Sequence, residues 1–255
     1  MRCSSRLLAL LASSGHALRL AMPRLHGLAF AELEAAHTFS RTANWLVPGH
    51  VMCGHYPGSC PSRPADAAVV AERVASIRAT GVCTFVCLQD ELPPQDSPWP
   101  EGGIPKQSDR AKWATGNFTN YRETALAAGS AAFLHYGLPD LSVAESLDAL
   151  DAIVLDLSCR VSDGDRLYIH CWGGRGRTGL VAACVLGVLY DELDADGALE
   201  RVQRCYELRE PSLKKSPETE EQKQQVRDWF ASKRAETRRL ACVERPDARS
   251  GESLR

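Results

Sequence analysis

The sequence predicts an α/β fold with a mostly parallel central sheet, flanked by helices on both faces and followed by additional C-terminal helices. Three observations predict it. Short apolar runs alternate with longer runs of helical spacing, which is the pattern of strands joined by crossover helices. The run at residues 82–88 is continuously apolar, as expected of a central strand buried on both faces. Helix-like runs then accumulate towards the C-terminus.

Size and composition are those of an ordinary globular protein. The 255 residues suffice for one sizeable domain plus tails. With 44% hydrophobic residues and a formal net charge of -2, the chain lacks the basic character of a general nucleic-acid or membrane-surface binder. We therefore expect no nucleic-acid partner. We also expect no transmembrane segment, because no apolar run reaches the length that one needs. The oligomeric state stays open.

The ten cysteines are scattered rather than placed at short, regular spacings. The closest pair, Cys83 and Cys87, lies in the predicted central strand. No CxxC pair or Cys/His cluster indicates zinc, so we expect no metal. We interpret most cysteines as small core residues, with Cys171 as the exception.

Residues 1–40 are predicted to be an N-terminal extension outside the fold. No acidic residue precedes Glu32, and arginines alternate with Leu, Ala and Ser, which is the composition of an organelle transit peptide. Two alternatives stay open. The run Leu7–Ala12 could be the core of a short signal peptide, or the segment could be a disordered or loosely helical extension without an address.

We expect the folded domain at residues 41–234. It opens with a strand at 51–53. A helix follows, which Pro64 starts at its first turn and Gly81 ends at the C-cap. The apolar strand at 82–88 comes next. One face of the helix between Pro64 and Gly81 is apolar: Val70, Val74 and Ile77.

Residues 89–116 are rich in Pro, Gly and charge, and are predicted to be a long surface loop bordering a binding cleft. A strand is expected at 133–138. A helix follows, with a capping box from Ser142 to Glu145, and Gly164 ends it. The apolar positions of this helix repeat at 3-4-3-4 spacing, as one helical face requires: Leu147, Leu150, Val154, Leu157 and Val161.

The next expected strand spans 165–170 and leads through a glycine-rich loop into the apolar helix 180–190. Two more helices are expected at about 196–208 and 218–233. The first of these carries Leu199, Val202 and Cys205 on one face. Residues 235–255 mix charged and small residues and are predicted to be a solvated tail.

The stretch HCWGGRGRTG, residues 170–179, joins the last strand to the apolar helix. A strand, a glycine-rich loop and a helix in this order form an anion cradle, because the loop amides and the helix N-terminus face the same ligand. The glycines permit the tight wrapping that this requires. We expect the loop residues to bind a phosphate group: Trp172, Gly173, Gly174, Arg175, Gly176 and Arg177.

Cys171 lies in this loop, and the amides, the helix N-terminus and the two loop arginines all favour its thiolate, the nucleophilic form. The guanidinium of Arg177 matches two phosphate oxygens with two parallel hydrogen bonds. A phosphate held there would have the Cys171 sulfur in line beneath phosphorus. The Thr178 hydroxyl is expected to stabilise the thiolate when it leaves.

Cys171 and Arg177 form a C-x5-R motif in its His-Cys...Gly-x-Arg-Thr-Gly form. The ten residues resemble the signature of the cysteine-dependent phosphatase superfamily, the protein tyrosine and dual-specificity phosphatases. The resemblance covers about residues 45–233. It implies a phosphocysteine intermediate at Cys171 and no metal or other cofactor. The short domain, without a Lys-Asn-Arg-Tyr segment, favours the dual-specificity or atypical branch.

The resemblance also implies a general acid on a separate loop. Asp140, in the sequence LPD and 31 residues before Cys171, matches that position better than Asp148 or Asp151, which lie in a predicted helix. The segment 216–226 resembles the late family segment in which a glutamine positions the hydrolytic water, and Gln222 is the candidate. His170 is expected to support the loop through a hydrogen bond.

The resulting prediction is a phosphomonoester hydrolase that acts on phosphotyrosine and/or phosphoserine/threonine in proteins. The main alternative is a phosphoinositide or other non-protein phosphatase. For this choice the loop gives a mixed signal, since it has Arg175, but Trp172 where some lipid-directed relatives have lysine. An inactive phosphate-binding module is a further alternative, although nucleophile, arginine and acid are all present. The His before Cys171 and the Arg-Thr-Gly after it argue against sulfur transfer or arsenate reduction.

A reactive thiol also bears on location, because oxidising compartments convert free cysteines to disulfides. We expect an intracellular reducing compartment. This is the cytoplasm, or a mitochondrion or plastid if the N-terminal extension is a transit peptide.

Overall fold

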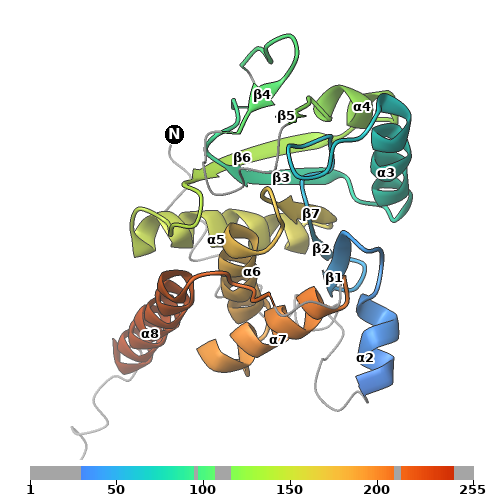
Figure 1. The fold of residues 1–255 in the computed structure, drawn as a ribbon. Helices are drawn as coiled ribbons and strands as arrows, with labels where there is room; N and C mark the ends of the chain where they lie inside the picture. The colour runs from blue at the N-terminus through green and yellow to red at the C-terminus, as the bar shows by residue number, and fades with distance from the viewer. Residues whose placement is uncertain (1–29, 95–96, 107–115, 210–213, 244–255) are drawn as a thin grey trace, which may run out of the picture.

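The computed structural model describes residues 30–94, 97–106, 116–209 and 214–243. Five of the described strands form one sheet in the order β1-β2-β7-β3-β6 (Figure 1). β1 pairs antiparallel with β2, and the remaining pairs are parallel. The strands are β1 Ala43–Val47, β2 Val51–Gly54, β3 Thr84–Gln89, β6 Ala132–Leu138 and β7 Leu167–His170. The predicted mostly parallel sheet is confirmed.

Helices cover both faces of this sheet. The described helices are α2 Phe30–His37, α3 Ala67–Ala79, α4 Arg122–Ala127, α5 Leu147–Ser162, α6 Gly176–Leu189, α7 Ala195–Glu207 and α8 Glu220–Val243. Successive residues of β3 point to opposite faces, as strand geometry requires. Phe85 and Cys87 join a core with α3 and α4, whereas Val86 and Leu88 join a larger core with α5, α6, α7 and α8. The predicted burial of this strand on both faces is therefore confirmed.

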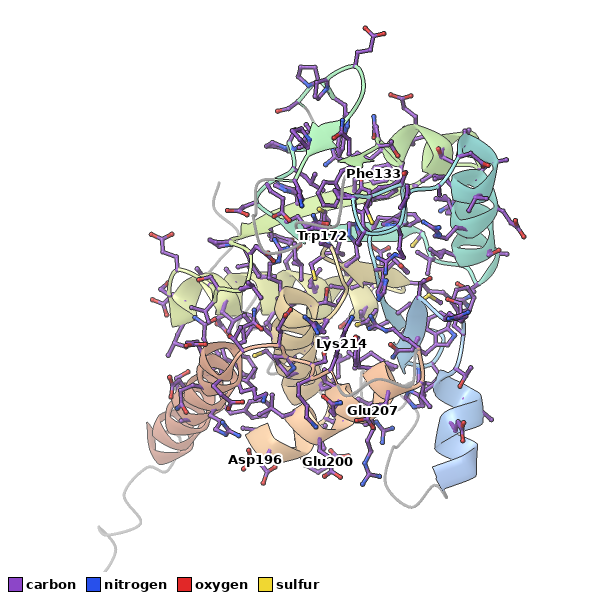
Figure 2. All side chains as sticks on the ribbon, in the orientation of Figure 1. Phe133, Trp172, Asp196, Glu200, Glu207 and Lys214 are labelled. Carbon is purple, nitrogen blue, oxygen red and sulfur yellow. The ribbon has the colours of Figure 1, made fainter. Side chains whose placement is uncertain are left out.

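α7 shows how the pattern of apolar residues determines orientation. Its predicted apolar positions Leu199, Val202 and Cys205 are buried. Figure 2 shows Asp196 and Glu200 pointing away from the body of the protein. The helix lies with its apolar face on α6, as an amphipathic helix at the surface does.

α3 starts later than the sequence analysis predicts. Its N-cap is Asp66, whose carboxylate accepts a hydrogen bond from the Val69 amide at 2.9 Å. An aspartate cap satisfies a free amide of the first turn, and Pro64 therefore lies before the helix rather than in its first turn. The predicted end is confirmed, since Gly81 adopts a φ of 90° just after the C-cap.

α5 also starts later than predicted. The hydroxyl of Ser146 caps it by accepting from the Ala149 amide at 3.1 Å. The predicted capping box from Ser142 to Glu145 is wrong, because those residues precede the helix. The predicted apolar face is confirmed over most of its length: Leu150, Val154, Leu157 and Val161 are buried.

The chain is ordered beyond two predicted limits. α2 falls within the predicted extension 1–40, and His37 at its end is buried and donates from Nδ1 to the Trp45 carbonyl at 2.8 Å. α8 continues to Val243, ten residues past the predicted helix end at 233. Residues 1–29 and 244–255 lie outside the described residues. The predicted targeting segment and most of the predicted tail therefore stay predictions.

Two further predictions concern the loop at 89–116 and the cysteines. The described part of the loop contains β4 (Ile104–Pro105), which pairs antiparallel with β5 (Asn117–Phe118). Residues 95–96 and 107–115 lie outside the described residues. Of the seven described cysteines other than Cys171, five are buried, as expected of small core residues. Within the described ranges, no helix is long and apolar enough to cross a membrane.

The strand order brings three chain segments to one edge of the sheet. β7 lies next to β3, and β3 lies next to β6, all in parallel. Their carboxyl ends therefore point the same way, towards the place where ligands bind in open α/β sheets. The residues that follow these ends are Asp90–Glu91, Asp140 and the loop 170–179.

Candidate active site

The glycine-rich loop follows β7 directly and turns into α6 at Gly176. Gly174 adopts a φ of 60°, and a Cβ atom there would lie 2.0 Å from the Gly54 carbonyl oxygen of β2. A side chain would therefore collide with the sheet, and only glycine lets the loop close this tightly. Cys171 is the first residue after β7 and is 3% exposed.

His170, the last residue of β7, supports the start of the loop through two contacts of its ring. Its Nδ1 lies 3.3 Å from the Cys171 carbonyl oxygen, and its Nε2 lies 2.7 Å from the Tyr121 hydroxyl. Burial lowers the pKa of His170 to about 3, so the ring is neutral near pH 7. A carbonyl only accepts, so Nδ1 carries the proton and Nε2 accepts from the Tyr121 hydroxyl. This agrees with the predicted supporting role.

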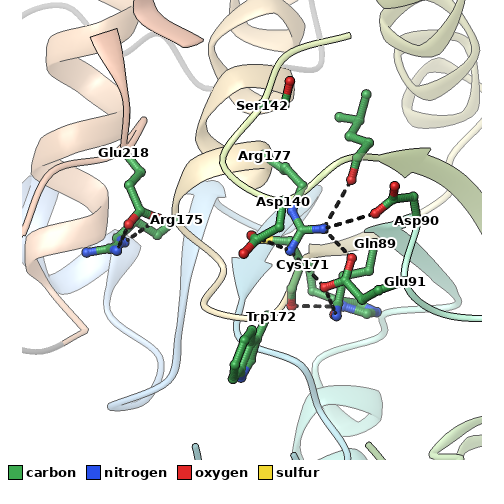
Figure 3. A network of polar contacts seen from close by, with 12 residues as sticks. Gln89, Asp90, Glu91, Asp140, Ser142, Cys171, Trp172, Arg175, Arg177 and Glu218 are labelled. Atoms are coloured by element: carbon green, nitrogen blue, oxygen red, sulfur yellow. Dashed lines mark hydrogen bonds and ion pairs between the residues drawn. The ribbon is translucent and has the colours of Figure 1, made fainter. Parts of the chain in front are cut away.

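Arg177 stands in the first turn of α6 and is 2% exposed (Figure 3). It donates from Nη1 to Glu91 Oε2 at 2.6 Å and from Nη2 to Glu91 Oε1 at 3.0 Å. Burial acts against its charge. The electrostatic interaction with Cys171 and the hydrogen bond to Glu91 outweigh this effect, and the pKa of Arg177 is raised. The guanidinium is therefore a permanent cation beside the thiol.

Asp140 is a second carboxylate in contact with the Arg177 guanidinium. Its Oδ1 accepts from Arg177 Nη2 at 2.9 Å, and its side chain is 37% exposed. The rival Asp151 accepts from Trp229 Nε1 and pairs with Lys233. The structure thus brings Asp140 to the loop, as predicted, and ties Asp151 to α8.

Glu91 is the site residue that the sequence analysis missed. It is 9% exposed in its side chain and also accepts from Gln89 Nε2 at 2.8 Å. Although burial raises the pKa of Glu91, the hydrogen bond and charge of Arg177 outweigh this and lower it. Its neighbour Asp90 lies farther out, 4.0 Å from Arg177 Nη1, and burial and Glu91 raise its pKa. The available signal was position, because Glu91 follows the carboxyl end of a buried strand.

We compared the chain with models of known protein families and with solved structures. Residues 133–238 match the model of a family described as PTP-SAK, "Swiss Army Knife protein, DSP-PTPase phosphatase domain". The matched part contains Asp140, the loop and the start of α8. Over these residues the chain is therefore similar to the dual-specificity-like branch of the cysteine-dependent phosphatase superfamily.

Solved phosphatase structures are similar to this chain, and the one with a TM-score of 0.50 shows that the fold is shared. Kinase associated phosphatase (KAP), with its catalytic-site cysteine replaced by serine, is 17% identical with a TM-score of 0.50, over 72% of this chain and 87% of that one. Tk-PTP in its active form is 21% identical with a TM-score of 0.48, over 74% and 97%. PTPMT1 in complex with PI(5)P is 14% identical with a TM-score of 0.49, over 76% and 98%. A search of curated protein sequences gave no significant match.

Two side chains of the phosphatase loop point away from Arg177. Arg175 donates from Nε to Glu218 Oε2 at 3.1 Å, and Figure 3 shows this pair apart from the cluster around Arg177. Trp172 donates from Nε1 to the Ser62 hydroxyl at 2.9 Å. Predicted phosphate binding by these two residues thus rests on their backbone amides.

Thr178 and Gln222 complete the predicted set. Thr178 is buried, and its hydroxyl has no hydrogen-bond partner within the described part of the chain. This leaves the hydroxyl free for the predicted contact with the thiolate. Gln222 is fully buried, and its amide nitrogen donates to the Ser142 carbonyl at 2.9 Å. Its contacts are those of a residue that connects chain segments, whereas the predicted role was to position water.

Proposed function

We propose that this phosphatase domain removes phosphate from phosphotyrosine and/or phosphoserine/threonine in proteins, through a phosphocysteine intermediate. The observation that carries the proposal is the meeting of three groups at one sheet edge. They are a buried cysteine in an amide-rich loop, a buried guanidinium in the next helical turn, and a carboxyl group 2.9 Å from that guanidinium.

In the first step the Cys171 thiolate attacks phosphorus and the ester P–O bond breaks. Arg177 binds two of the phosphoryl oxygens and stabilises the charge that they share in the transition state. Asp140 gives its proton to the leaving oxygen. Because Arg177 Nη2 holds Asp140 in the free site, binding of phosphate exchanges this contact for phosphate oxygens, while Glu91 keeps its place behind the guanidinium.

In the second step a water molecule attacks phosphorus, and the P–S bond breaks. The ionised Asp140 takes the proton from water, and inorganic phosphate and the thiolate are released. The unpartnered hydroxyl of Thr178 supports its predicted role in stabilising that thiolate. The two steps return every group to its starting state, as turnover requires.

The surroundings of the loop favour a phosphoprotein over a phosphoinositide. Arg175 pairs with Glu218, so its charge is already offset, and Trp172 packs its ring edge-to-face on Phe118 at 5.4 Å. Inositol phospholipids with several phosphates need more positive charge around the loop than one monoester does. A non-protein substrate is the alternative that the experiment must separate.

The test is an activity panel. We expect phosphopeptides carrying phosphotyrosine, phosphoserine or phosphothreonine to be hydrolysed with higher kcat/KM than phosphatidylinositol phosphates in mixed micelles. Cys171→Ser should lose at least about 10³-fold in kcat, because the nucleophile is removed. Cys83→Ser, a half-buried cysteine outside the loop, is the matched control and should keep wild-type rates.

Two outcomes would contradict the proposal. Wild-type rates in Cys171→Ser on every substrate would exclude the phosphocysteine route. Hydrolysis of the lipid substrates alone would replace the protein substrate with the phosphoinositide alternative and leave the mechanism in place.

A further inference from the structure

Two glutamines of α8 hold the segment that follows Asp140. Gln222 Nε2 donates to the Ser142 carbonyl at 2.9 Å. Gln225 Oε1 accepts from the Ala144 amide at 2.9 Å, and Gln225 Nε2 donates to the Ala144 carbonyl at 2.8 Å. The two side chains are three residues apart, so they lie on one face of the helix. Three hydrogen bonds therefore tie the acid loop, residues 139–144, to α8.

Gln222 is itself fixed at its other end. Its side-chain Oε1 accepts from the backbone amide of Thr219 at 3.2 Å, and the backbone amide of Gln222 donates to the Thr219 hydroxyl at 3.2 Å. This is the reciprocal arrangement of a capping box, which sets the first turn of a helix. Gln222 Oε1 also accepts from the Glu218 amide at 3.0 Å. A fully buried side chain with these contacts has a fixed orientation, and its Nε2 is aimed at the acid loop.

The acid loop needs such support because its backbone is strained. The Ser142 amide donates to the Pro139 carbonyl at 3.1 Å, closing a turn with Asp140 and Leu141 at its centre. Leu141 adopts a φ of 62°, which a residue with a side chain rarely takes. A strained turn of this kind persists when its surroundings hold both ends. Gln222 holds the end at Ser142.

The segment 216–219, which leads into α8, contacts the glycine-rich loop 170–179, called the phosphate loop below. The Ser216 hydroxyl donates to the Arg175 carbonyl at 2.9 Å, and Glu218 pairs with the Arg175 guanidinium. A Cβ atom on Gly176 would lie 3.1 Å from both amide atoms of Gln222, so the loop packs directly on this side chain. Residues 216–225 thus touch the phosphate loop on one side and the acid loop on the other.

We infer that Gln222 and Gln225 are positioning residues, which fix the acid loop relative to the phosphate loop and hold Asp140 where it reaches the leaving oxygen. The inference rests on the proposed function, since it requires Asp140 to be the general acid. It gives Gln222 a role that acts through the backbone of residues 142 and 144.

The test uses variants that remove these contacts with little change in shape. Gln222→Glu keeps the capping box, for which glutamate is a normal partner, but has no N–H for the Ser142 carbonyl. Gln225→Met removes both bonds to Ala144 at similar volume. Gln224→Glu is the matched control, because Gln224 is exposed on the same helix and bonds to Asp228.

A misplaced acid has a specific kinetic signature. We expect Gln222→Glu and Gln225→Met to lower kcat for phenyl phosphate about tenfold, part of the 10²–10⁴ that a general acid supplies. The rate on 2,4-dinitrophenyl phosphate, whose leaving group needs no proton, should change less than about twofold. The basic limb of the pH–rate profile should flatten, and Gln224→Glu should match the wild type.

The Asp140→Asn background decides whether the effect passes through the acid. There, Gln222→Glu and Gln225→Met should cause no further loss on phenyl phosphate. Equal losses on both aryl phosphates, or a further loss in Asp140→Asn, would overturn the inference. An unchanged leaving-group dependence in Asp140→Asn would also overturn the inference, because Asp140 would then not be the general acid. If Cys171→Ser is inactive in the same experiment, the proposed phosphatase function still stands. Wild-type activity in Cys171→Ser would instead remove the proposed function, and the inference with it.

Discussion

The two sides of the site are built differently. The nucleophile side is one continuous stretch, residues 170–179, held between β7 and α6, and its Cys171 and Arg177 are 3% and 2% exposed. The acid side is assembled from residues 89–91, 139–142 and 216–225, which are far apart in sequence.

Exposure and contacts follow the same division. The side chains of Asp140 and Asp90 are 37% and 45% exposed, and side-chain amides of α8 hold the acid loop. The nucleophile side is therefore preorganised largely by its own backbone, with Tyr121 and Ser216 in support. The acid side depends on a few tertiary hydrogen bonds, which single substitutions can weaken without destroying the fold.

The largest expected effect tests whether the two loop arginines are equivalent. Arg177→Lys should lower kcat/KM for p-nitrophenyl phosphate by about 10³-fold, because lysine cannot donate two parallel hydrogen bonds to phosphate. Arg175→Lys should cost tenfold or less, since this side chain contacts Glu218 rather than the site. Steady-state kinetics of both variants measures the difference, and equal losses would mean that both guanidinium groups bind phosphate.

A smaller effect is expected on the acid side. Asp140→Asn should lower kcat for phenyl phosphate by roughly 10²-fold and remove the basic limb of the pH–rate profile, because the proton donor is lost. Asp148→Asn, an exposed position on α5, is the control and should keep the wild-type profile. A basic limb that survives in Asp140→Asn would assign the acid to another group, of which Asp90 is the nearest candidate.

Glu91→Gln should have a milder effect, lowering kcat/KM about tenfold. The variant keeps a hydrogen-bond acceptor for Arg177 but removes the charge that orients it. Because the pKa of Glu91 is lowered by Arg177, its stabilising contribution is present above its unfolded pKa and lost as pH falls through the folded one. Chemical denaturation below about pH 4 should therefore separate wild type and variant less than at pH 7. If the difference in unfolding free energy between wild type and variant is the same at both pH values, the Glu91–Arg177 ion pair does not contribute to stability.

The last prediction concerns stability rather than activity, through the protonation of His170. Its pKa falls from 6.5 to about 3 on folding, so the unfolded chain binds a proton more readily between these values. Through this group alone, stability should be complete above pH 6.5 and roughly 2 kcal/mol lower at pH 5. His170→Asn should reduce the slope of unfolding free energy against pH in this window. A slope equal to that of the wild type would mean that the ring stays accessible to protons.

Local sequence predicted most of the secondary structure, and its errors share one cause. Residues on the buried faces of α3, α5 and α7 were read correctly from spacing, because apolar periodicity follows from helix geometry. The starts of α3 and α5 were misplaced, since more than one residue near each could serve as a cap. Asp66 and Ser146 form the caps, because their side chains accept hydrogen bonds from the Val69 and Ala149 amides.

The sequence by itself determined the nucleophile side. The strand, loop and helix of residues 167–189 are consecutive, so the glycines, Cys171 and Arg177 carry their geometry in local backbone constraints. Only the tertiary structure decided the acid side. The pairing of β3 with β7 and β6 brings Glu91 and Asp140 to one guanidinium. The packing of α8 turns Gln222 towards Ser142. Contacts between residues dozens of positions apart depend on sheet order and helix packing, which a motif in one segment does not specify.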